Sequence, residues 1–497
     1  MTGRLDRLAG DARRLLRQHW ALVLLLLGGL VLRALVMLAY RPAFWYQGDS
    51  QSYLVLAYRM EPGTIRPYGY SLFLDLFLAF HSVALITAVQ HLMGLAVAVA
   101  AYALLRRRDV SRLISALAVA PLVFDARTVV LEHFLLAETL FTALLTIGMV
   151  ALAWNRTPGW LGTLVAAGVF SWAAVTRTIG LVALAVPLLY LLLRRVSWRR
   201  TGVFVAVVGT VLGGYVFWYH HVHGQYSFGT FGSRFLWART TSFVNCERAG
   251  FTPQERQLCP PHPIEYRWPP DTYLWSWLTP EQKRPEYDEL FARFARKAVL
   301  AQPGDYATTV ARDTWTLIRP GPYPGEKARC VADMWTFPAA APQGCQPYLA
   351  PADPATKRYA GLVSERDRNP LTGPLHRYSG LATVPGAALA ALCFLLALAL
   401  ACYRPRSSPW REHLDPLAWT GLAFGMIVAS IATSAIDPRY GLPSMPLAVV
   451  GAALAWRRFR VVRQYGRRDD DRPVPAGSGG TGPSEPVAAA VGPPSRV

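Results

Sequence analysis

Features of soluble and nucleic-acid-binding proteins are scarce in this sequence. Only 16% of its 497 residues are charged, whereas 53% are hydrophobic, and the hydrophobic residues gather in several long runs. Lysine is nearly absent, which we attribute to the base composition of a GC-rich genome rather than to chemistry. No internal repeat is obvious, which disfavours transporters built from inverted repeats. The composition therefore predicts an all-α polytopic membrane protein.

The formal net charge of +20 is explained by the position of the arginines. Basic clusters recur between the hydrophobic runs, at residues 106–108, 194–200, 404–411 and 457–463. Such clusters are typical of the cytoplasmic loops of membrane proteins. We therefore interpret the basic balance as a sign of membrane topology and not of nucleic-acid binding.

Hydrophobic runs and basic loops together predict about ten transmembrane helices with both termini in the cytoplasm. The first run, residues 20–40, would be about 30 Å long as a helix, enough to cross a bilayer. It lacks a small-residue cleavage site, so we expect a retained anchor. Five arginines precede it and should keep the N-terminus inside: Arg4, Arg7, Arg13, Arg14 and Arg17. The other expected spans are residues 83–105, 113–124, 134–154, 161–175, 179–193, 203–219, 381–403, 416–436 and 441–456.

These spans divide the chain into a cytoplasmic N-terminus (1–19), helices one to seven (20–219), an extracytoplasmic segment (220–380), helices eight to ten (381–456) and a disordered cytoplasmic tail (457–497). The tail is charged and rich in Gly, Pro and Ser, so it cannot bury a core. Within the long segment, residues 287–300 have the apolar spacing of an amphipathic helix.

Four of the six cysteines lie in the extracytoplasmic segment, which we expect to be a mixed domain. Of the three possible pairings we favour the local ones, Cys246 with Cys259 and Cys330 with Cys345, because each closes a short loop. A metal site is less favoured because no CxxC spacing is present. Disulfides form in oxidising compartments, so the cysteines and the basic clusters place this segment on the same, outer side.

The loop after the first span, residues 41–82, contains the sequences GDSQSYL and RPYGYSLFL. These motifs resemble the first external loop of the GT-C superfamily of polyprenyl-phosphate-sugar-dependent glycosyltransferases, which includes protein O-mannosyltransferases and lipid A aminoarabinose transferases. The resemblance implies a GT-C-type bundle, a catalytic carboxylate at Asp49 and a donor-phosphate contact at Arg66. Many protein O-mannosyltransferases have an acidic pair here, whereas this chain has Gly48 before Asp49, so the substrate class does not carry over.

Three further stretches resemble GT-C segments. LEHFLLAETLF contains Glu132 and Glu138, TRTIGL contains Arg177, and DPRYGLP contains Arg439 and Tyr440. The resemblance covers about the first 200 and the last 60 residues. It supports Arg177 and Arg439 as further donor-phosphate ligands.

Several ionisable side chains lie where the expected helices run short. Residues 113–124 would span only about 18 Å of a hydrocarbon layer about 30 Å thick. Asp125, Arg127, Glu132 and His133 would then lie below the outer surface, unless the helix continues through them. Charges at such depth are costly unless they face one another or a wet cavity. We therefore expect a charged cavity that opens to the outside.

Sugar transfer from a polyprenyl phosphate needs a base for the acceptor hydroxyl and positive charge for the departing phosphate. Asp49 is the candidate base, and a single carboxylate without a covalent intermediate implies inversion. Arginines bind phosphate oxygens in pairs, which suits the donor-phosphate role. The supporting candidates are Glu132, His133, Glu138 and Tyr440. The first loop has no Asp-x-Asp, so we expect transfer without metal or cofactor.

Structural roles remain open for the same residues. Asp49 could cap the following helix, and Arg66 could reach to the membrane interface. Arg177 and Arg439 could form ion pairs with Glu138 or Asp437.

Two other features favour structural roles. Arg33, in the middle of the first span, is expected to pair with a buried carboxylate. The histidines of HHVH, residues 220–223, are more typical of a membrane interface than of a metal site.

The sequence thus predicts a membrane glycosyltransferase that transfers a hexosyl or pentosyl group. Its partners would be a polyprenyl-phosphate sugar, membrane lipid and a glycan, lipid or protein acceptor at the outer face of the plasma membrane. A secondary transporter is an alternative that broken helices, paired repeats and a charged site facing the cytoplasm would favour. An O-antigen-ligase-like enzyme is another, but it would be expected to lack an early acidic loop.

Overall fold

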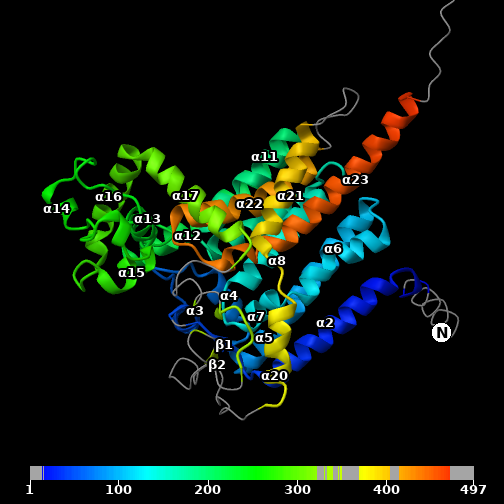
Figure 1. Cartoon of the computed structure of the whole chain (residues 1–497), viewed down its shortest axis with the longest axis horizontal. Coiled ribbons are helices and arrows are strands. Elements are labelled where there is room, and N and C mark those ends of the chain that lie inside the picture. Colours follow the sequence, from blue (N-terminus) through cyan, green and yellow to red (C-terminus); the bar gives the residue numbers. More distant parts are fainter. Residues whose placement is uncertain are drawn as a thin grey trace, which may run out of the picture.

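The computed structural model describes residues 16–46, 48–321, 369–402 and 413–470, together with 14, 330, 333–339, 345, 348 and 349. These residues form a helical bundle and a smaller helical lobe beside it (Figure 1). Arg4, Arg7, Arg13 and the tail beyond residue 470 lie outside the described residues.

Within these described residues, five helical segments are long and apolar enough to cross a membrane. They are α2 (Trp20–Ala39), α5 (Val83–Arg107), α12 (Trp198–His223), α20 with α21 (Thr372–Cys402) and α22 (Leu414–Thr433). The bent pair α6 (Arg112–Phe124) and α7 (Ala126–His133) would be a sixth span. Shorter apolar helices are α8 (Glu138–Ala153), α9 (Trp160–Thr176) and α10 with α11 (Ile179–Leu193), and the last helix is α23 (Met445–Asp470).

Helices therefore occupy every predicted span, and the chain is an all-α, multi-pass membrane protein, as predicted. The full set of ten crossings stays a prediction.

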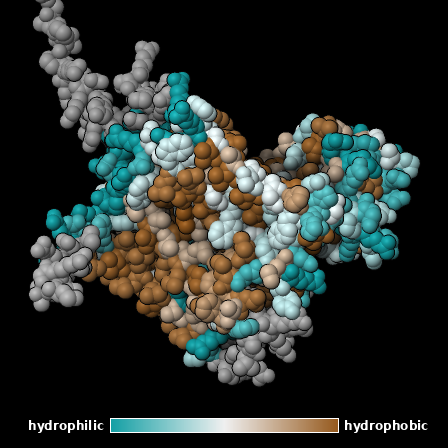
Figure 2. Space-filling model, turned by 180° about the vertical axis from the view of Figure 1, so that it is seen from behind, coloured by the Kyte–Doolittle hydropathy of each residue, from teal (hydrophilic) through white to brown (hydrophobic). Residues whose placement is uncertain are grey.

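The outer surface of the bundle is apolar. In the most apolar stretch of α2, only 17% of the residues are buried inside the protein. Large side chains such as Leu24, Leu27 and Leu30 are exposed. Figure 2 shows hydrophobic side chains covering much of one face of the bundle, with hydrophilic ones concentrated at its ends and on the lobe. A surface of this extent and polarity is stable in contact with lipid.

The helix that starts at Arg112 ends at Phe124, its predicted end, and the short helix α7 follows it. A bend of 50° separates α6 from α7, and Asp125 lies at the bend. Its carboxylate accepts hydrogen bonds from the backbone N–H of Thr128 at 2.8 Å and of Val384 at 2.6 Å. Asp125 thus caps α7 and ties it to the segment before α21, which gives this buried carboxylate a structural role.

Helix α23 continues to Asp470, past Trp456 where the sequence analysis ends the last span and begins a disordered tail. The first part of that tail is therefore helical, which corrects the prediction. Arginine and glutamine are good helix formers, and no proline occurs before Pro473.

The lobe is built from α13 (Gly232–Thr240), α14 (Pro253–Arg256), α15 (Pro270–Thr272), the π-helix η3 (Tyr273–Trp277), α16 (Asp288–Ala301) and α17 (Pro303–Ile318). Helix α16 matches the predicted amphipathic helix and buries Leu290, Phe291 and Phe294 in a core of its own. The domain predicted to be mixed is thus almost wholly helical in its described residues.

Two disulfides and one strand pairing stabilise the long segment between α12 and α21. Both disulfides are the local ones that the sequence favours, Cys246–Cys259 and Cys330–Cys345. The short strand β2 (Tyr348–Leu349) pairs antiparallel with β1 (Phe44–Trp45). This pairing brings the long segment onto the loop that carries Asp49.

Candidate functional site

Asp49 is the first residue of helix α3 (Asp49–Arg59). It follows Gly48, whose φ of +82° lies in the region that favours glycine, which explains why a second acidic residue is unsuited to this position. The N-cap of this helix is Gly48 and not Asp49. Asp49 Oδ1 instead accepts from Arg66, from Nη2 at 2.7 Å and from Nε at 3.2 Å. The carboxylate is therefore held in an ion pair and not in a helix cap.

The loop with Arg66 packs against the end of α9 through Gly69, the first residue of α4 (Gly69–Asp75). A Cβ at Gly69 would lie 2.6 Å from the carbonyl oxygen of Val175, so the close approach requires glycine. The indole N–H of Trp172 donates to the carbonyl oxygen of Gly69 at 2.9 Å. This contact brings the Arg66 loop beside Arg177, which follows α9.

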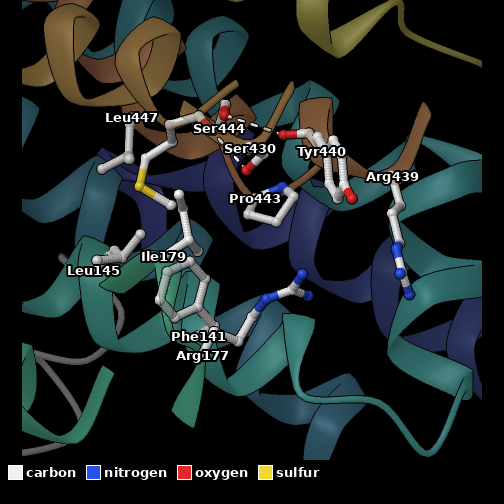
Figure 3. Close-up of a pocket in the computed structure, with 11 residues that line it drawn as sticks. Phe141, Leu145, Arg177, Ile179, Ser430, Arg439, Tyr440, Pro443, Ser444 and Leu447 are labelled. Carbon is white, nitrogen blue, oxygen red and sulfur yellow. Dashed lines mark hydrogen bonds between the residues drawn. The ribbon is translucent and has the colours of Figure 1, made fainter. Parts of the chain in front are cut away.

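Arg439, on the short helix η6 (Pro438–Gly441), connects three carboxylates. Its Nη1 lies 3.6 Å from Asp49 Oδ2 and 3.4 Å from Glu138 Oε1, and its Nε lies 2.9 Å from Asp437 Oδ2. Glu138 Oε1 also pairs with Arg177, and Figure 3 shows the side chains of Arg177 and Arg439 extending toward the same space.

Six residues thus form one charge cluster: Asp49, Arg66, Glu138, Arg177, Asp437 and Arg439. Three arginines face three carboxylates, so their formal charges cancel. The structure brings together five residues that the sequence analysis selected for the site, and it adds Asp437.

Part of the charge cluster has unused hydrogen-bonding capacity. Within the described part of the chain, Glu138 Oε2 and Arg439 Nη1 are buried and form no hydrogen bond. Buried polar atoms without a partner are rare in folded proteins. They mark a place where a polar ligand group could bind.

Charge states at the site follow from burial and from neighbouring charges. Burial lowers the pKa of Arg66, but the adjacent Asp49 outweighs it, and the pKa is raised overall. Arg439 lowers the pKa of Tyr46, but burial together with Asp437 and Asp49 raises it to about 12. Arg66 is therefore charged and Tyr46 is neutral near pH 7, which leaves Tyr46 unsuited to act as a base.

Two aromatic rings cover Arg439. The guanidinium carbon lies 4.9 Å from the centroid of the Tyr46 ring, and Trp335 stacks on Tyr46 with centroids 5.9 Å apart. Trp335 is fully buried and lies between the disulfide cysteines Cys330 and Cys345. The sequence did not indicate this position of Trp335, because no motif surrounds the residue and only its place inside the disulfide loop could have suggested it.

Two cavities meet at the charge cluster. The large cavity, of about 780 Å³, is lined by Asp49 and Asp437 and by residues of the lobe. The small cavity, of about 300 Å³, is lined by Arg177 and mainly by uncharged side chains. Arg66, Arg439 and Tyr440 line both cavities. A crevice of about 20 Å³ continues beside Arg177 (Figure 3).

Glu132 and His133 belong to a separate buried network and not to the charge cluster. Arg33 donates to Glu132 from Nε at 2.9 Å and from Nη2 at 2.8 Å. Glu132 is therefore the buried carboxylate that the sequence predicts as the partner of Arg33. His91 Nδ1 lies 2.9 Å from Glu132, and His91 Nε2 lies 3.0 Å from His133 Nδ1. This network links α2, α5 and α7.

The histidines of the HHVH stretch lie in the last turn of α12. His223 Nε2 contacts the carbonyl oxygen of Pro62 at 2.6 Å, and His220 packs edge-on against Tyr226. Among the described residues, no group of three or more His, Cys, Asp or Glu side chains is placed to hold a metal ion.

Two solved membrane proteins are similar in structure to this chain. ArnT from Cupriavidus metallidurans bound to undecaprenyl phosphate is matched over 90% of this chain and 79% of ArnT, with 14% identity and a TM-score of 0.36. The archaeal oligosaccharyltransferase AglB from Archaeoglobus fulgidus, in complex with an inhibitory peptide and a dolichol-phosphate, is matched over 92% of this chain and 52% of AglB, with 10% identity and a TM-score of 0.40.

ArnT and AglB are glycosyltransferases of the GT-C superfamily, the superfamily that the sequence motifs resemble. The chain is similar to them. At these TM-scores the likeness is distant, and it assigns no residue of the site. No protein-family model and no curated protein sequence matches the chain.

Proposed function

We propose that this protein transfers a hexosyl or pentosyl group from a polyprenyl-phosphate donor to the hydroxyl of an acceptor. The position of Asp49 carries the proposal. Its carboxylate lines the large cavity and contacts Arg66 and Arg439, which also line the small cavity. A base and phosphate-binding cations thus meet where two cavities join, as sugar transfer from a phosphate requires.

The small cavity suits the donor phosphate and the adjoining part of its lipid. Three arginines line it, and no acidic side chain does so among the described residues. Apolar side chains line much of the remainder: Ile65, Ile179, Val182, Phe231, Phe235 and Leu236. Undecaprenyl phosphate in ArnT and dolichol-phosphate in AglB are ligands of the same chemical class.

In the proposed reaction Asp49 takes the proton of the acceptor hydroxyl. At the same time the oxygen of that hydroxyl forms a bond to the anomeric carbon. The bond from that carbon to the phosphate oxygen breaks, and its electron pair stays on the phosphate. Arg66, Arg177 and Arg439 stabilise the charge that develops there. Attack and departure on opposite faces of the sugar, without a covalent intermediate, invert its configuration.

We place this site on the outer face of the plasma membrane. The lobe that lines the large cavity contains the Cys246–Cys259 disulfide, and Cys345 of the second disulfide also lines it. Disulfides form in oxidising compartments. The basic clusters between the helices favour a cytoplasmic location for both termini.

Incubation of purified protein with a panel of radiolabelled polyprenyl-phosphate sugars tests the proposal. We expect release of lipid phosphate from at least one donor and a product of inverted anomeric configuration by NMR. We also expect the reaction to continue in EDTA, because the arginines supply the positive charge. Binding of such donors without cleavage of any, as a transporter would show, would contradict the proposal, and a loss in EDTA restored by a divalent ion would contradict its metal-independent form.

A further inference from the structure

We propose that the large cavity binds a neutral saccharide as the acceptor and that the ring of this saccharide stacks on Trp275. The inference rests on the proposed sugar transfer and narrows its acceptor from a glycan, lipid or protein to one chemical class. Four features of the cavity carry it: an exposed tryptophan, its rigid support, its connection to Asp49 and the charge of the lining.

Trp275 is presented to the cavity from a rigid support. It lies in the π-helix η3, a rare backbone form that is often found at functional sites. The preceding residues Tyr273 and Leu274 are buried in the core of the lobe. The ring of Phe231 stacks on Trp275, with centroids 5.8 Å apart and planes at 16°. Trp275 nevertheless remains 45% exposed and lines the cavity, so a large flat apolar surface is available there.

Trp275 is joined to the charge cluster through a single ring. Phe235 lies edge-on to Trp275, with centroids 6.1 Å apart, and the guanidinium carbon of Arg66 lies 6.0 Å from the Phe235 centroid. Arg66 in turn holds Asp49. A molecule bound on Trp275 would therefore extend along the cavity toward the candidate base.

The two cavities differ in charge. Among its described lining residues, the large cavity has the carboxylates of Asp49, Asp271 and Asp437 and the arginines Arg66 and Arg439. The small cavity has arginines and no acidic side chain among its described lining residues. Coulombic repulsion by these carboxylates makes the large cavity less favourable than the small one for a phosphate or a uronic acid. A neutral acceptor fits it better.

A pyranose matches this lining. One face of such a ring carries C–H groups that pack on an aromatic surface, while its hydroxyl groups lie around the edge. Polar side chains that line the same cavity and can bind hydroxyl groups include Ser52, Asp271 and Ser276. In the part of the chain that the structure describes, six aromatic residues line the cavity: Trp45, Tyr46, Phe134, Phe235, Trp275 and Tyr440. A volume of about 780 Å³ is within the range of small-ligand sites.

Saturation-transfer NMR on the full chain in lipid nanodiscs tests the inference without any donor. Nanodiscs are needed because maltoside detergents themselves present pyranose rings. The probes are methyl α-mannopyranoside, methyl α-glucopyranoside, methyl β-galactopyranoside, methyl β-glucuronide and a neutral Ser/Thr hexapeptide. We expect saturation of the ring C–H protons of at least one neutral pyranoside, and little for the glucuronide or the peptide.

Three variants make the test specific. Trp275→Ala should weaken pyranoside binding by about tenfold, whereas Trp275→Phe should keep most of it. Trp268→Ala is the matched control, because Trp268 is 42% exposed on the same lobe and does not line the cavity. Release of lipid phosphate from a donor is measured separately on the unmodified protein and on Trp268→Ala, which separates this inference from the proposed function.

The inference is overturned if no neutral pyranoside binds, if Trp275→Ala binds pyranosides as well as the unmodified protein, or if the glucuronide or the peptide binds better. A folded protein that binds pyranosides on Trp275 but cleaves no polyprenyl-phosphate sugar would instead contradict the proposed function.

Discussion

Arg66 is positioned to serve both the candidate base and the donor. Its guanidinium donates to Asp49 and lines the small cavity. Under the proposed function, a donor phosphate that binds this guanidinium would also leave Asp49 freer to accept a proton. The arginine should therefore matter more for the donor than for the acceptor.

Arg66→Ala should weaken the binding of undecaprenyl phosphate by about tenfold to a hundredfold, the usual range for a charge-assisted hydrogen bond. Equilibrium binding of the radiolabelled lipid measures this, with Arg66→Lys as a control that keeps the charge. Acceptor affinity should change little. An equal loss for donor and acceptor would count against the phosphate role.

Glu255 gives the lobe a pH-dependent stability. Burial raises the pKa of Glu255, but hydrogen bonds from Lys297, at 2.7 Å, and from the backbone of Thr252, at 2.8 Å, outweigh it and lower the pKa below its ordinary value of 4.5. Because the folded value is lower than the unfolded one, ionised Glu255 stabilises the lobe above pH 4.5, and this stability is lost as the pH falls below it.

Glu255→Gln removes the charge and keeps the cap of helix α14. Between neutral pH and about pH 3.5, the melting temperature of the unmodified protein should fall further than that of Glu255→Gln. Differential scanning fluorimetry of both proteins across this range measures the difference. An equal fall in the melting temperature of both proteins would show that the ion pair with Lys297 contributes no stability.

At the scale of the helices, the Arg33–Glu132 ion pair joins α2 to α7 in the membrane-spanning part of the bundle. Both side chains are about 2% exposed, and a Cβ at Gly94 would lie 1.8 Å from Glu132, so Gly94 on α5 provides the space for this carboxylate. Removal of one partner from such a pair leaves an uncompensated buried charge.

Glu132→Ala should therefore destabilise the bundle by about 3–5 kcal/mol. The double variant Arg33→Leu with Glu132→Leu should be clearly more stable than Glu132→Ala, because it leaves neither charge behind. Unfolding in mixed detergent gives both values. Destabilisation of the double variant equal to or greater than that of Glu132→Ala would contradict the claim that the remaining buried charge causes the loss.

Hydropathy could predict the positions of the helices, because each crossing needs a long apolar run. It could not predict which neighbouring helix each buried side chain faces. Glu132 and Glu138 have similar expected depths, yet Glu132 faces His91 and Glu138 faces Arg177 and Arg439. Which side of a helix faces the cavity depends on how the helices pack, and a single sequence does not contain that information.

Loop residues could not be predicted for a related reason. Trp275 comes to the large cavity only through the folding of the lobe. Trp335 comes to Tyr46, which lines that cavity, only through the folding of the segment between Cys330 and Cys345. Neither lies in a motif or in a periodic pattern. Asp49, Arg66, Arg177 and Arg439 were recognisable because they lie in short sequences that resemble GT-C segments.

For the whole molecule, the proposed function requires the lobe to lie on the outer side of the membrane and the basic loops on the cytoplasmic side. Cysteine labelling in intact cells tests this, in a background in which the exposed Cys402 is replaced by serine. Glu265→Cys on the lobe should react with a membrane-impermeant maleimide, whereas Thr157→Cys, in the turn before α9, should react only after lysis. The reverse pattern would place the site in the cytoplasm.

The central claim is that Asp49 acts as the base in a cavity shared with phosphate-binding arginines. The most direct test is the rate of transfer from a polyprenyl-phosphate sugar by Asp49→Asn, beside the unmodified protein and Glu265→Gln as a surface control. Loss of a general base predicts a fall of about 10²- to 10⁴-fold for Asp49→Asn, with donor binding and melting temperature kept. Transfer by Asp49→Asn at the unmodified rate would contradict the account.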